Sequence, residues 1–153
     1  MITYPDNSFL CALYRNQDNS VQALEFSGEL TEPLRVTRLL LWEFRQSARF
    51  QAFRNRKDPS SGYPMTEAEK MIAKVGEHLE GGKLKLAHCD FLSVLATAEG
   101  ISRSRTFSGG HRSFDVLHVA TALALDAREF LSFDSKQNAL AAAEGLATPL
   151  RVI

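Results

Sequence analysis

The sequence predicts an α/β fold in which a mainly parallel sheet of about five strands is covered by helices on both faces. Short apolar segments of strand length alternate along the chain with longer segments of helical periodicity. Such alternation favours parallel strands joined by crossover helices, which cover the two faces of the sheet. The 153 residues, of which 44% are hydrophobic and 24% charged, are expected to form one domain over residues 1–153.

The expected strands are short runs rich in β-branched, leucine or aromatic residues, bounded by polar or turn residues. The first begins directly at the N-terminus, and the fourth, EFLSF, is followed by an aspartate. In chain order the expected strands are residues 2–4, 33–38, 83–88, 129–133 and 149–153.

The expected helices begin after capping residues and end at glycine or proline. Asp6 precedes the first helix, Thr66 caps the fourth and Asp90 the fifth, whereas a Gly-Gly pair closes the fourth. A polar loop, SRTFSGGHRS, separates the fifth helix from the sixth. In chain order the expected helices are residues 8–14, 20–26, 39–54, 66–79, 91–100, 114–125 and 136–144.

Composition excludes several classes of protein. The 18 basic and 18 acidic residues give no net charge, so no global field draws the chain to nucleic acid. We expect neither a signal peptide nor a membrane span, because no basic segment with a long apolar core occurs. Cys11 and Cys89 lie far apart without zinc-site spacing, and two buried free thiols in a cytoplasmic protein are expected.

Four carboxylates fall close to strand-to-helix turns of the predicted fold. Asp6 and Asp134 follow predicted strands, and Asp115 opens an apolar helix. Glu43 lies in the first turns of the helix that follows the second predicted strand. Because the carboxyl ends of parallel strands meet at one edge of a sheet, the four side chains are expected to converge there.

Each carboxylate also has a structural explanation. Asp6 and Asp134 suit helix N-caps, and Asp115 suits a cap or a first turn, where one such residue contributes ~1 kcal/mol. Glu43 interrupts LLLWEF at the margin of an apolar stripe, where a carboxylate needs a partner or solvent. Carboxylates ~4–5 Å apart repel by roughly 3–4 kcal/mol at a dielectric constant of 20, so a cluster requires protonation or a divalent cation. An all-oxygen site favours Mg²⁺ or Mn²⁺.

Four stretches carry a family resemblance that spans nearly the whole chain. They are DNSFL, TRLLLWEFRQSA, GHRSFDVLHVATAL and FLSFDSKQNALAAAEGL, in this order. In these stretches the chain resembles PIN-domain proteins, close to the VapC-like toxin ribonucleases of bacterial toxin–antitoxin pairs. The resemblance implies a PIN-like three-layer α/β/α sandwich and a metal-dependent endoribonuclease that hydrolyses phosphodiester bonds of single-stranded RNA.

The resemblance also implies site residues and partners. Asp6, Glu43, Asp115 and Asp134 occupy the positions of the acidic set that binds Mg²⁺ or Mn²⁺. The supporting residues that it implies are Ser8, which accompanies the first acid, and Ser132, at a position where threonine is common. The implied partners are an RNA substrate and a cognate antitoxin, whose apolar helix would lie in a groove of the N-terminal helices; a homodimer is possible.

Two other functions remain open. One is a non-catalytic PIN-like module that binds RNA or protein, although the intact acidic set argues against it. The other is a different Mg²⁺ pocket, such as that of a phosphatase or receiver domain. The sequence DNS replaces the DxD motif of haloacid-type phosphatases, and neither GxGxxG nor a phosphate-loop lysine motif occurs.

Basic side chains near the acids have alternative roles. His118 in the apolar helix is expected to be a hydrogen-bonded core residue rather than a catalytic base. Arg112 follows a Gly-Gly pair and suits a phosphate contact, although a solvated loop is equally consistent. Arg45, Arg49 and Arg56 share a helical face roughly 120° or more from Glu43, expected to be solvated and without interleaved aromatic residues.

Overall fold

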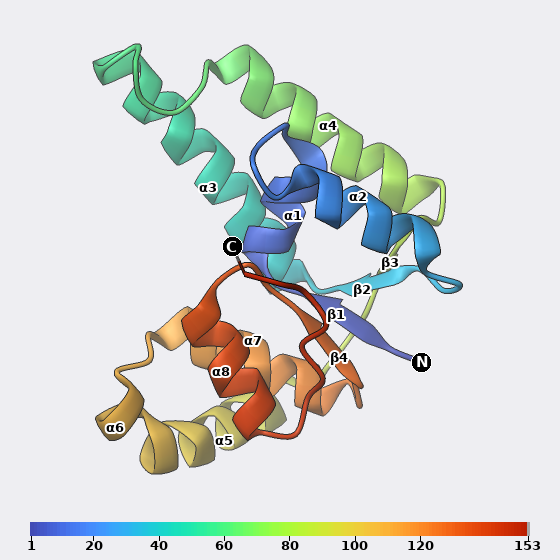
Figure 1. Ribbon diagram of the computed structural model, residues 1–153, viewed down its shortest axis with the longest axis vertical. Helices are drawn as coiled ribbons and strands as arrows, with labels where there is room; N and C mark the ends of the chain where they lie inside the picture. The colour runs from blue at the N-terminus through green and yellow to red at the C-terminus, as the bar shows by residue number, and fades with distance from the viewer. Residues whose placement is uncertain (153) are drawn as a thin grey trace.

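The structure is a computed structural model that describes residues 1–152. Two pairs of short parallel strands lie at its centre: β1 (Thr3–Pro5) pairs with β4 (Glu129–Leu131), and β2 (Leu34–Val36) pairs with β3 (Leu84–Leu86). Strands β1 and β2 lie next to each other, which gives the spatial order β3, β2, β1, β4 (Figure 1). The carboxyl ends of all four strands therefore point the same way.

Helices cover the strands on two sides. Figure 1 shows α1 to α4 on one side of the strands and α5 to α8 on the other. Their bounds are α1 (Asn7–Tyr14), α2 (Ser20–Glu29), α3 (Arg38–Lys57), α4 (Met65–Glu80), α5 (Phe91–Ile101), α6 (Phe107–Gly109), α7 (Ser113–Ala124) and α8 (Ser135–Ala143), with a π-helical turn over Ser102–Thr106. The predicted α/β class with parallel strands is confirmed.

The prediction of a single sheet of about five strands is wrong. Within residues 1–152, no backbone hydrogen bond joins β1 to β2, so the strands form two separate two-stranded sheets. Asp6 donates its N–H to Leu131 of β4. In a strand, the backbone N–H and C=O groups of successive residues point to opposite edges. Because those of Asp6 point to β4, those of Pro5 point to β2, and proline has no N–H to donate.

The fifth predicted strand, residues 149–153, is also absent as such. A single parallel bridge joins Glu129 to Ala147, because the Phe130 N–H donates to the Ala147 carbonyl and the Ala147 N–H to that of Arg128. Residues 149–152 form no strand, and Ile153 lies outside the described residues. Leu150 is nevertheless buried, so this segment packs by its side chains.

The helices agree with the prediction except at two places. Helix α4 begins at Met65, after Pro64, so Thr66 lies inside the helix and does not cap it. Most of the predicted loop at 104–113 is helical, because Arg105 fixes it to the end of α8. Its guanidinium donates to the Glu144 carboxylate at 2.6 Å and to the Ala143 carbonyl at 2.9 Å.

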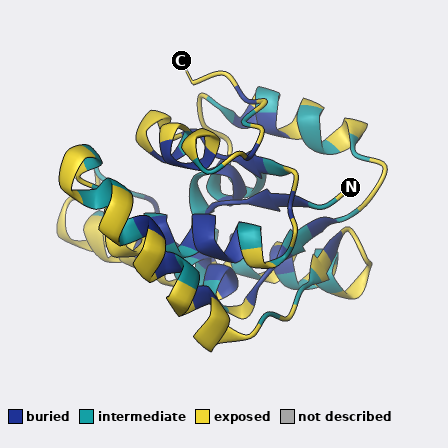
Figure 2. Ribbon diagram, turned by 90° about the horizontal axis from the view of Figure 1, so that it is seen from below, coloured by how far each residue is buried: buried dark blue, intermediate teal, exposed yellow. Residues whose placement is uncertain are grey.

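The core surrounds the central strands. Figure 2 shows buried residues along the strands and on the inner sides of the helices, with exposed residues on their outer sides. Tyr4, Phe44 and Phe130 are among its fully buried large side chains. Cys11 and Cys89 are free thiols as predicted, but both are only partly buried. Among residues 1–152, no helix is both long and apolar enough to cross a membrane.

Candidate active site

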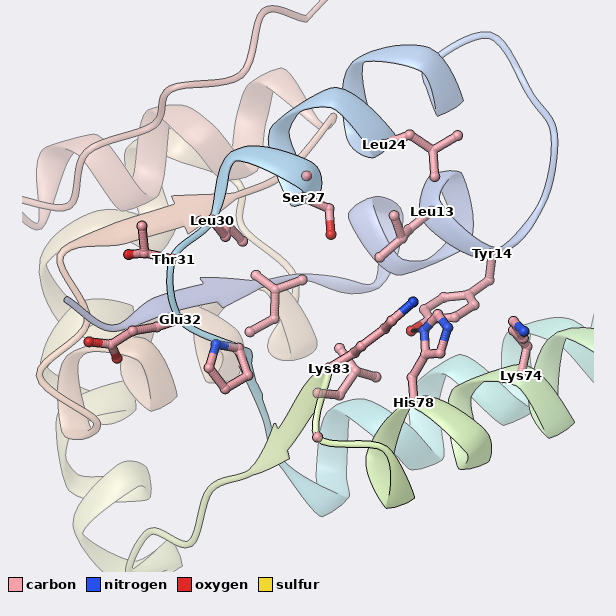
Figure 3. Close-up of a pocket in the computed structure, with 15 residues that line it drawn as sticks. Leu13, Tyr14, Leu24, Ser27, Leu30, Thr31, Glu32, Lys74, His78 and Lys83 are labelled. Carbon is pink, nitrogen blue, oxygen red and sulfur yellow. Dashed lines mark hydrogen bonds between the residues drawn. The ribbon is translucent and has the colours of Figure 1, made fainter.

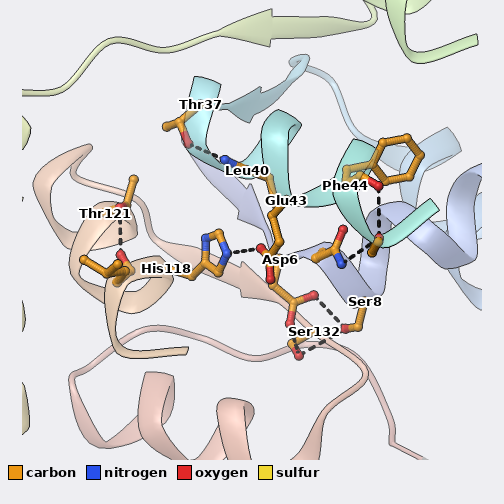
Figure 4. Close-up of polar contacts among 12 residues, drawn as sticks. Asp6, Ser8, Thr37, Leu40, Glu43, Phe44, His118, Thr121 and Ser132 are labelled. Atoms are coloured by element: carbon orange, nitrogen blue, oxygen red, sulfur yellow. Dashed lines mark hydrogen bonds and ion pairs between the residues drawn. The ribbon is translucent and has the colours of Figure 1, made fainter. Parts of the chain in front are cut away.

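Asp6 is a buried carboxylate at the end of β1. Its side chain caps α1 through a hydrogen bond from the Phe9 N–H to Oδ1 at 3.0 Å, as expected from the sequence. Ser8 Oγ donates to the same oxygen at 2.6 Å, and Ser132 Oγ donates to Oδ2 at 2.5 Å. Only 3% of Asp6 is exposed, so both of its oxygens depend on protein donors (Figure 4).

Ser8 and Ser132 connect Asp6 to the segment that follows β4. The Ser8 hydroxyl accepts from the Phe133 N–H at 2.9 Å, and the Ser132 hydroxyl accepts from the Asp134 N–H at 3.0 Å. Each serine therefore donates to Asp6 and accepts from the backbone beside Asp134. The two serines fix the Asp6 carboxylate relative to the turn that carries Asp134.

Gln137 connects Asp6 to Asp115. One terminal amide atom of Gln137 lies 3.1 Å from Asp115 Oδ1 and 3.2 Å from Asp6 Oδ2, and when it is assigned as the nitrogen it donates to both carboxylates. Asp115 lies in the first turn of α7, and Gln137 is buried in the first turn of α8. Carboxylates from distant segments of the chain thus share one nitrogen atom. Gln137 lies in the stretch FLSFDSKQNALAAAEGL, which carries part of the family resemblance, but it was not among the predicted site residues.

Asp134 is the exposed member of the acidic set. It caps α8, because its Oδ1 accepts from the Lys136 and Gln137 N–H groups at 2.8 and 3.1 Å. The pKa of Asp115 is raised, first by partial burial and then by the negative charges of Asp134 and Glu43. Asp134 and Glu43 therefore lie close enough to Asp115 to repel its ionised form.

Glu43 belongs to a hydrogen-bonded chain that leads into the core. Its Oε2 contacts His118 Nε2 (Figure 4). His118 Nδ1 lies 2.9 Å from the Tyr4 hydroxyl. The neutral tautomer with its proton on Nε2 satisfies both contacts, since it donates to Glu43 and accepts from Tyr4. Burial, with the charges of Glu43 and Asp6, raises the pKa of Tyr4, so Tyr4 keeps its proton.

His118 is therefore the hydrogen-bonded core residue that the sequence predicted, and Glu43 has the partner that its position at the edge of the core requires. The contact between the two was not predicted, although His118 follows Asp115 by three residues and hence lies on the same side of α7.

Among residues 1–152, no lysine or arginine forms an ion pair with an acid of the cluster. Burial raises the pKa of Asp6, although hydrogen bonds from Ser132, Ser8 and the Phe9 N–H oppose the shift. Arg112 is an exposed residue that precedes α7. Its charge lowers the pKa of Asp115, but this effect is smaller than those of burial, Asp134, His118 and Glu43 on the same pKa. The arrangement therefore favours added protons or cations.

The donor atoms fit a hard divalent cation in kind. Asp6, Glu43, Asp115 and Asp134 offer only carboxylate oxygens, which Mg²⁺ and Mn²⁺ prefer. Within residues 1–152, however, no three His, Cys, Asp or Glu side chains are grouped as a ready-made metal site. Mg²⁺ usually keeps several water ligands and needs only one or two carboxylates. A hydrated ion is therefore compatible with Asp6 and Asp115.

A separate groove lies on the side of the molecule formed by α1, α2 and α4. Its volume is about 600 Å³. Figure 3 shows leucines on one side of the groove, and Lys74, His78 and Lys83 on the other. His78 Nδ1 lies 2.7 Å from the Tyr14 hydroxyl. The groove is thus apolar along one side and basic along the other, and it shares no lining residue with the acidic cluster.

Comparison with known proteins identifies the architecture. No protein-family model matches the sequence, and no curated protein matches it. Among solved structures, the chain matches VapC20 of Mycobacterium tuberculosis, described as a toxin that cleaves the sarcin–ricin loop, with a TM-score of 0.65. The match covers 95% of this chain and 96% of that chain at 15% sequence identity. The two proteins share a fold.

Proposed function

We propose that this chain is a metal-dependent endoribonuclease that hydrolyses phosphodiester bonds of single-stranded RNA and acts as the toxin of a toxin–antitoxin pair. The observation that supports the proposal most is the shared contact of Gln137 with Asp6 and Asp115. Capping explains one carboxylate at a time, but it does not explain two that converge from distant segments. The fold shared with a toxin that cleaves RNA adds independent support.

Asp6, Asp115 and Asp134 are the residues proposed to hold Mg²⁺ or Mn²⁺, directly or through water. A bound divalent ion lowers the pKa of water and stabilises charge on phosphate oxygens. Ser8 and Ser132 keep Asp6 in one orientation through hydrogen bonds to its two oxygens. Arg112 is a further candidate for contact with the phosphate, because it is exposed and close to Asp115.

Glu43 is proposed to help hold the ion or to orient the attacking water. His118 contacts Glu43 Oε2, which leaves Oε1 for a water molecule. Tyr4 holds His118 in the tautomer that donates to Glu43, so Glu43 stays an acceptor. The buried pair His118 and Tyr4 are positioning residues in this mechanism.

Cleavage of a fluorescent single-stranded RNA, measured with Mg²⁺ and with chelator, tests this function. We expect cleavage with Mg²⁺ or Mn²⁺, none with chelator and full recovery when the ion is restored. Asp134→Asn is expected to lower the rate roughly a hundredfold, since it removes a metal-binding charge. Asp90→Asn is the matched control, because Asp90 is also an exposed N-cap but lies outside the cluster.

Equal rates for the two variants would mean that Asp134 acts only as a cap. Cleavage that persists in chelator would contradict metal dependence. RNA binding without cleavage under all conditions would favour the binding module instead.

The antitoxin is proposed to bind the groove of α1, α2 and α4 with one helix. The leucines on one side suit the apolar face of such a helix, and Lys74 and Lys83 on the other side suit acidic residues beside it. Leu24→Arg, in the groove, should abolish co-purification with the product of a neighbouring reading frame. Val21→Arg on the same helix is the control, since Val21 is exposed but does not line the groove. Equal retention of the partner by both variants would place it elsewhere.

A further inference from the structure

Two exposed aromatic side chains lie beside the acidic cluster. Trp42 on α3 and Phe114 on α7 are 50% and 37% exposed, and their rings stack with centroids 6.1 Å apart at an interplanar angle of 28°. Each directly precedes an acid of the cluster, Glu43 or Asp115. The Phe114 ring lies 6.3 Å from that of His118, which contacts Glu43. The aromatic pair therefore borders the acidic cluster.

The face of α3 that carries Trp42 is basic. Arg38 lies four residues before Trp42, Arg45 three residues after it and Arg49 seven residues after it. All three therefore lie within about 60° of Trp42 around the helix. No ion pair found within residues 1–152 involves any of the three. Arg45 and Arg49 belong to the face that was expected to have no interleaved aromatic residue, and Trp42 lies at the edge of this face, about 20° from Arg49.

We infer that Trp42 and Phe114 form a platform on which a base of single-stranded RNA stacks, next to the phosphate held at the acidic cluster. This inference rests on the proposed ribonuclease function. Aromatic rings bind unpaired bases by stacking, and arginines beside them bind the phosphates of the same strand. In a duplex the base faces are already stacked on their neighbours, so the platform selects unpaired RNA.

A second copy of the chain fits this surface less well. In a two-fold symmetric contact each surface meets its own counterpart, so the arginines of one copy would face those of the other. The surface offers two rings to bury, whereas three arginines that form no ion pair within residues 1–152 lie beside Trp42 on α3. Single-stranded RNA offers planar bases to the two rings and phosphates to the arginines. An identical basic surface offers no such match.

Trp42 is the only tryptophan of the chain, so its fluorescence reports on the platform directly. In the full-length Asp6→Asn protein, in which the proposed hydrolysis is expected to be strongly slowed, a short single-stranded RNA should quench the emission at saturation. A duplex of the same length and inorganic polyphosphate should not quench it, because neither offers an unstacked base.

Variants measure how much the platform contributes. Trp42→Leu should weaken the binding of a labelled single-stranded RNA roughly tenfold, and Trp42→Phe should restore most of the affinity. In the active protein, Trp42→Leu should raise KM and leave kcat nearly unchanged. Phe53→Leu is the matched control, since Phe53 lies on the same helix and is 49% exposed, yet is distant from the cluster.

The outcomes separate this inference from the proposed function. Metal-dependent cleavage with unchanged Trp42 fluorescence, or equal losses for Trp42→Leu and Phe53→Leu, would overturn the platform and leave the nuclease intact. Absence of both binding and cleavage would overturn both. Emission that shifts with protein concentration and ignores RNA would assign the surface to self-association and likewise overturn the platform.

Discussion

Asp6→Asn is expected to lower RNA cleavage by a factor of roughly 10²–10⁴ and, in the same protein, to raise thermal stability at neutral pH. The loss of activity follows from removal of a carboxylate proposed to bind the metal ion, which is worth several kcal/mol in the transition state. The gain in stability follows from the burial of this side chain. Asparagine keeps an oxygen that accepts from the Phe9 N–H, but it has no charge to bury.

The sign of the pH dependence follows from the raised pKa of Asp6. A raised folded-state pKa means that the folded protein binds this proton more tightly than the unfolded chain. The stability that Asp6 contributes is therefore fully present below its ordinary pKa and is lost as pH rises through the folded-state pKa. Denaturant titrations of wild type and Asp6→Asn should converge at low pH and diverge as pH rises, with the variant more stable.

Asp90 provides the control with the opposite sign. Hydrogen bonds from Ser93 and the Leu92 N–H lower its pKa, so its contribution appears above its ordinary pKa and is lost as pH falls. Asp90→Asn should therefore be less stable than wild type at neutral pH. An Asp6→Asn protein that is no more stable than wild type at any pH would show that the buried charge carries no net cost.

His118→Ala is expected to lower the free energy of unfolding by about 2–4 kcal/mol. The imidazole is buried, so its removal leaves a cavity and deprives the Tyr4 hydroxyl of its partner. Cleavage should fall at least about tenfold, because Glu43 loses the side chain that orients it. Urea denaturation and single-turnover cleavage of RNA measure the two effects.

The control for His118 is His78, whose Nδ1 also lies within hydrogen-bonding distance of a tyrosine hydroxyl. His78 is partly exposed and contacts no carboxylate of the cluster, so His78→Ala should cost less than about 1 kcal/mol and leave cleavage unchanged. A His118→Ala protein with the kcat and pH profile of wild type would limit His118 to a structural role.

Local sequence signals predicted most of the elements. Helix caps such as Asp6, Asp90 and Asp134 fixed the starts of their helices, and alternation of apolar segments gave the parallel strands. The single sheet was mispredicted because strand propensity does not show to which neighbouring strand the backbone groups of a residue point. Pro5 faces β2, and this becomes evident only once the pairing of β1 with β4 is known.

The site was predictable where topology alone decides position. The rule that parallel strands end at one edge brought Asp6 and Asp115 into the same prediction, and the structure places both beside Gln137. Neither Gln137 nor Tyr4 was predicted as a site residue, because their roles depend on partners distant along the chain. Whether the four acids act in catalysis stays a prediction.

Because no backbone hydrogen bond joins β1 to β2, a seam between these two strands separates the pair β1 and β4 from the pair β2 and β3. Asp6 and Asp134 follow strands on one side, and Glu43 follows β2 on the other. Across the seam, side-chain packing takes the place of main-chain hydrogen bonds. A small shift of β2 along β1 would therefore break no backbone hydrogen bond between these two strands. Such a shift would change the distance between Glu43 and Asp6.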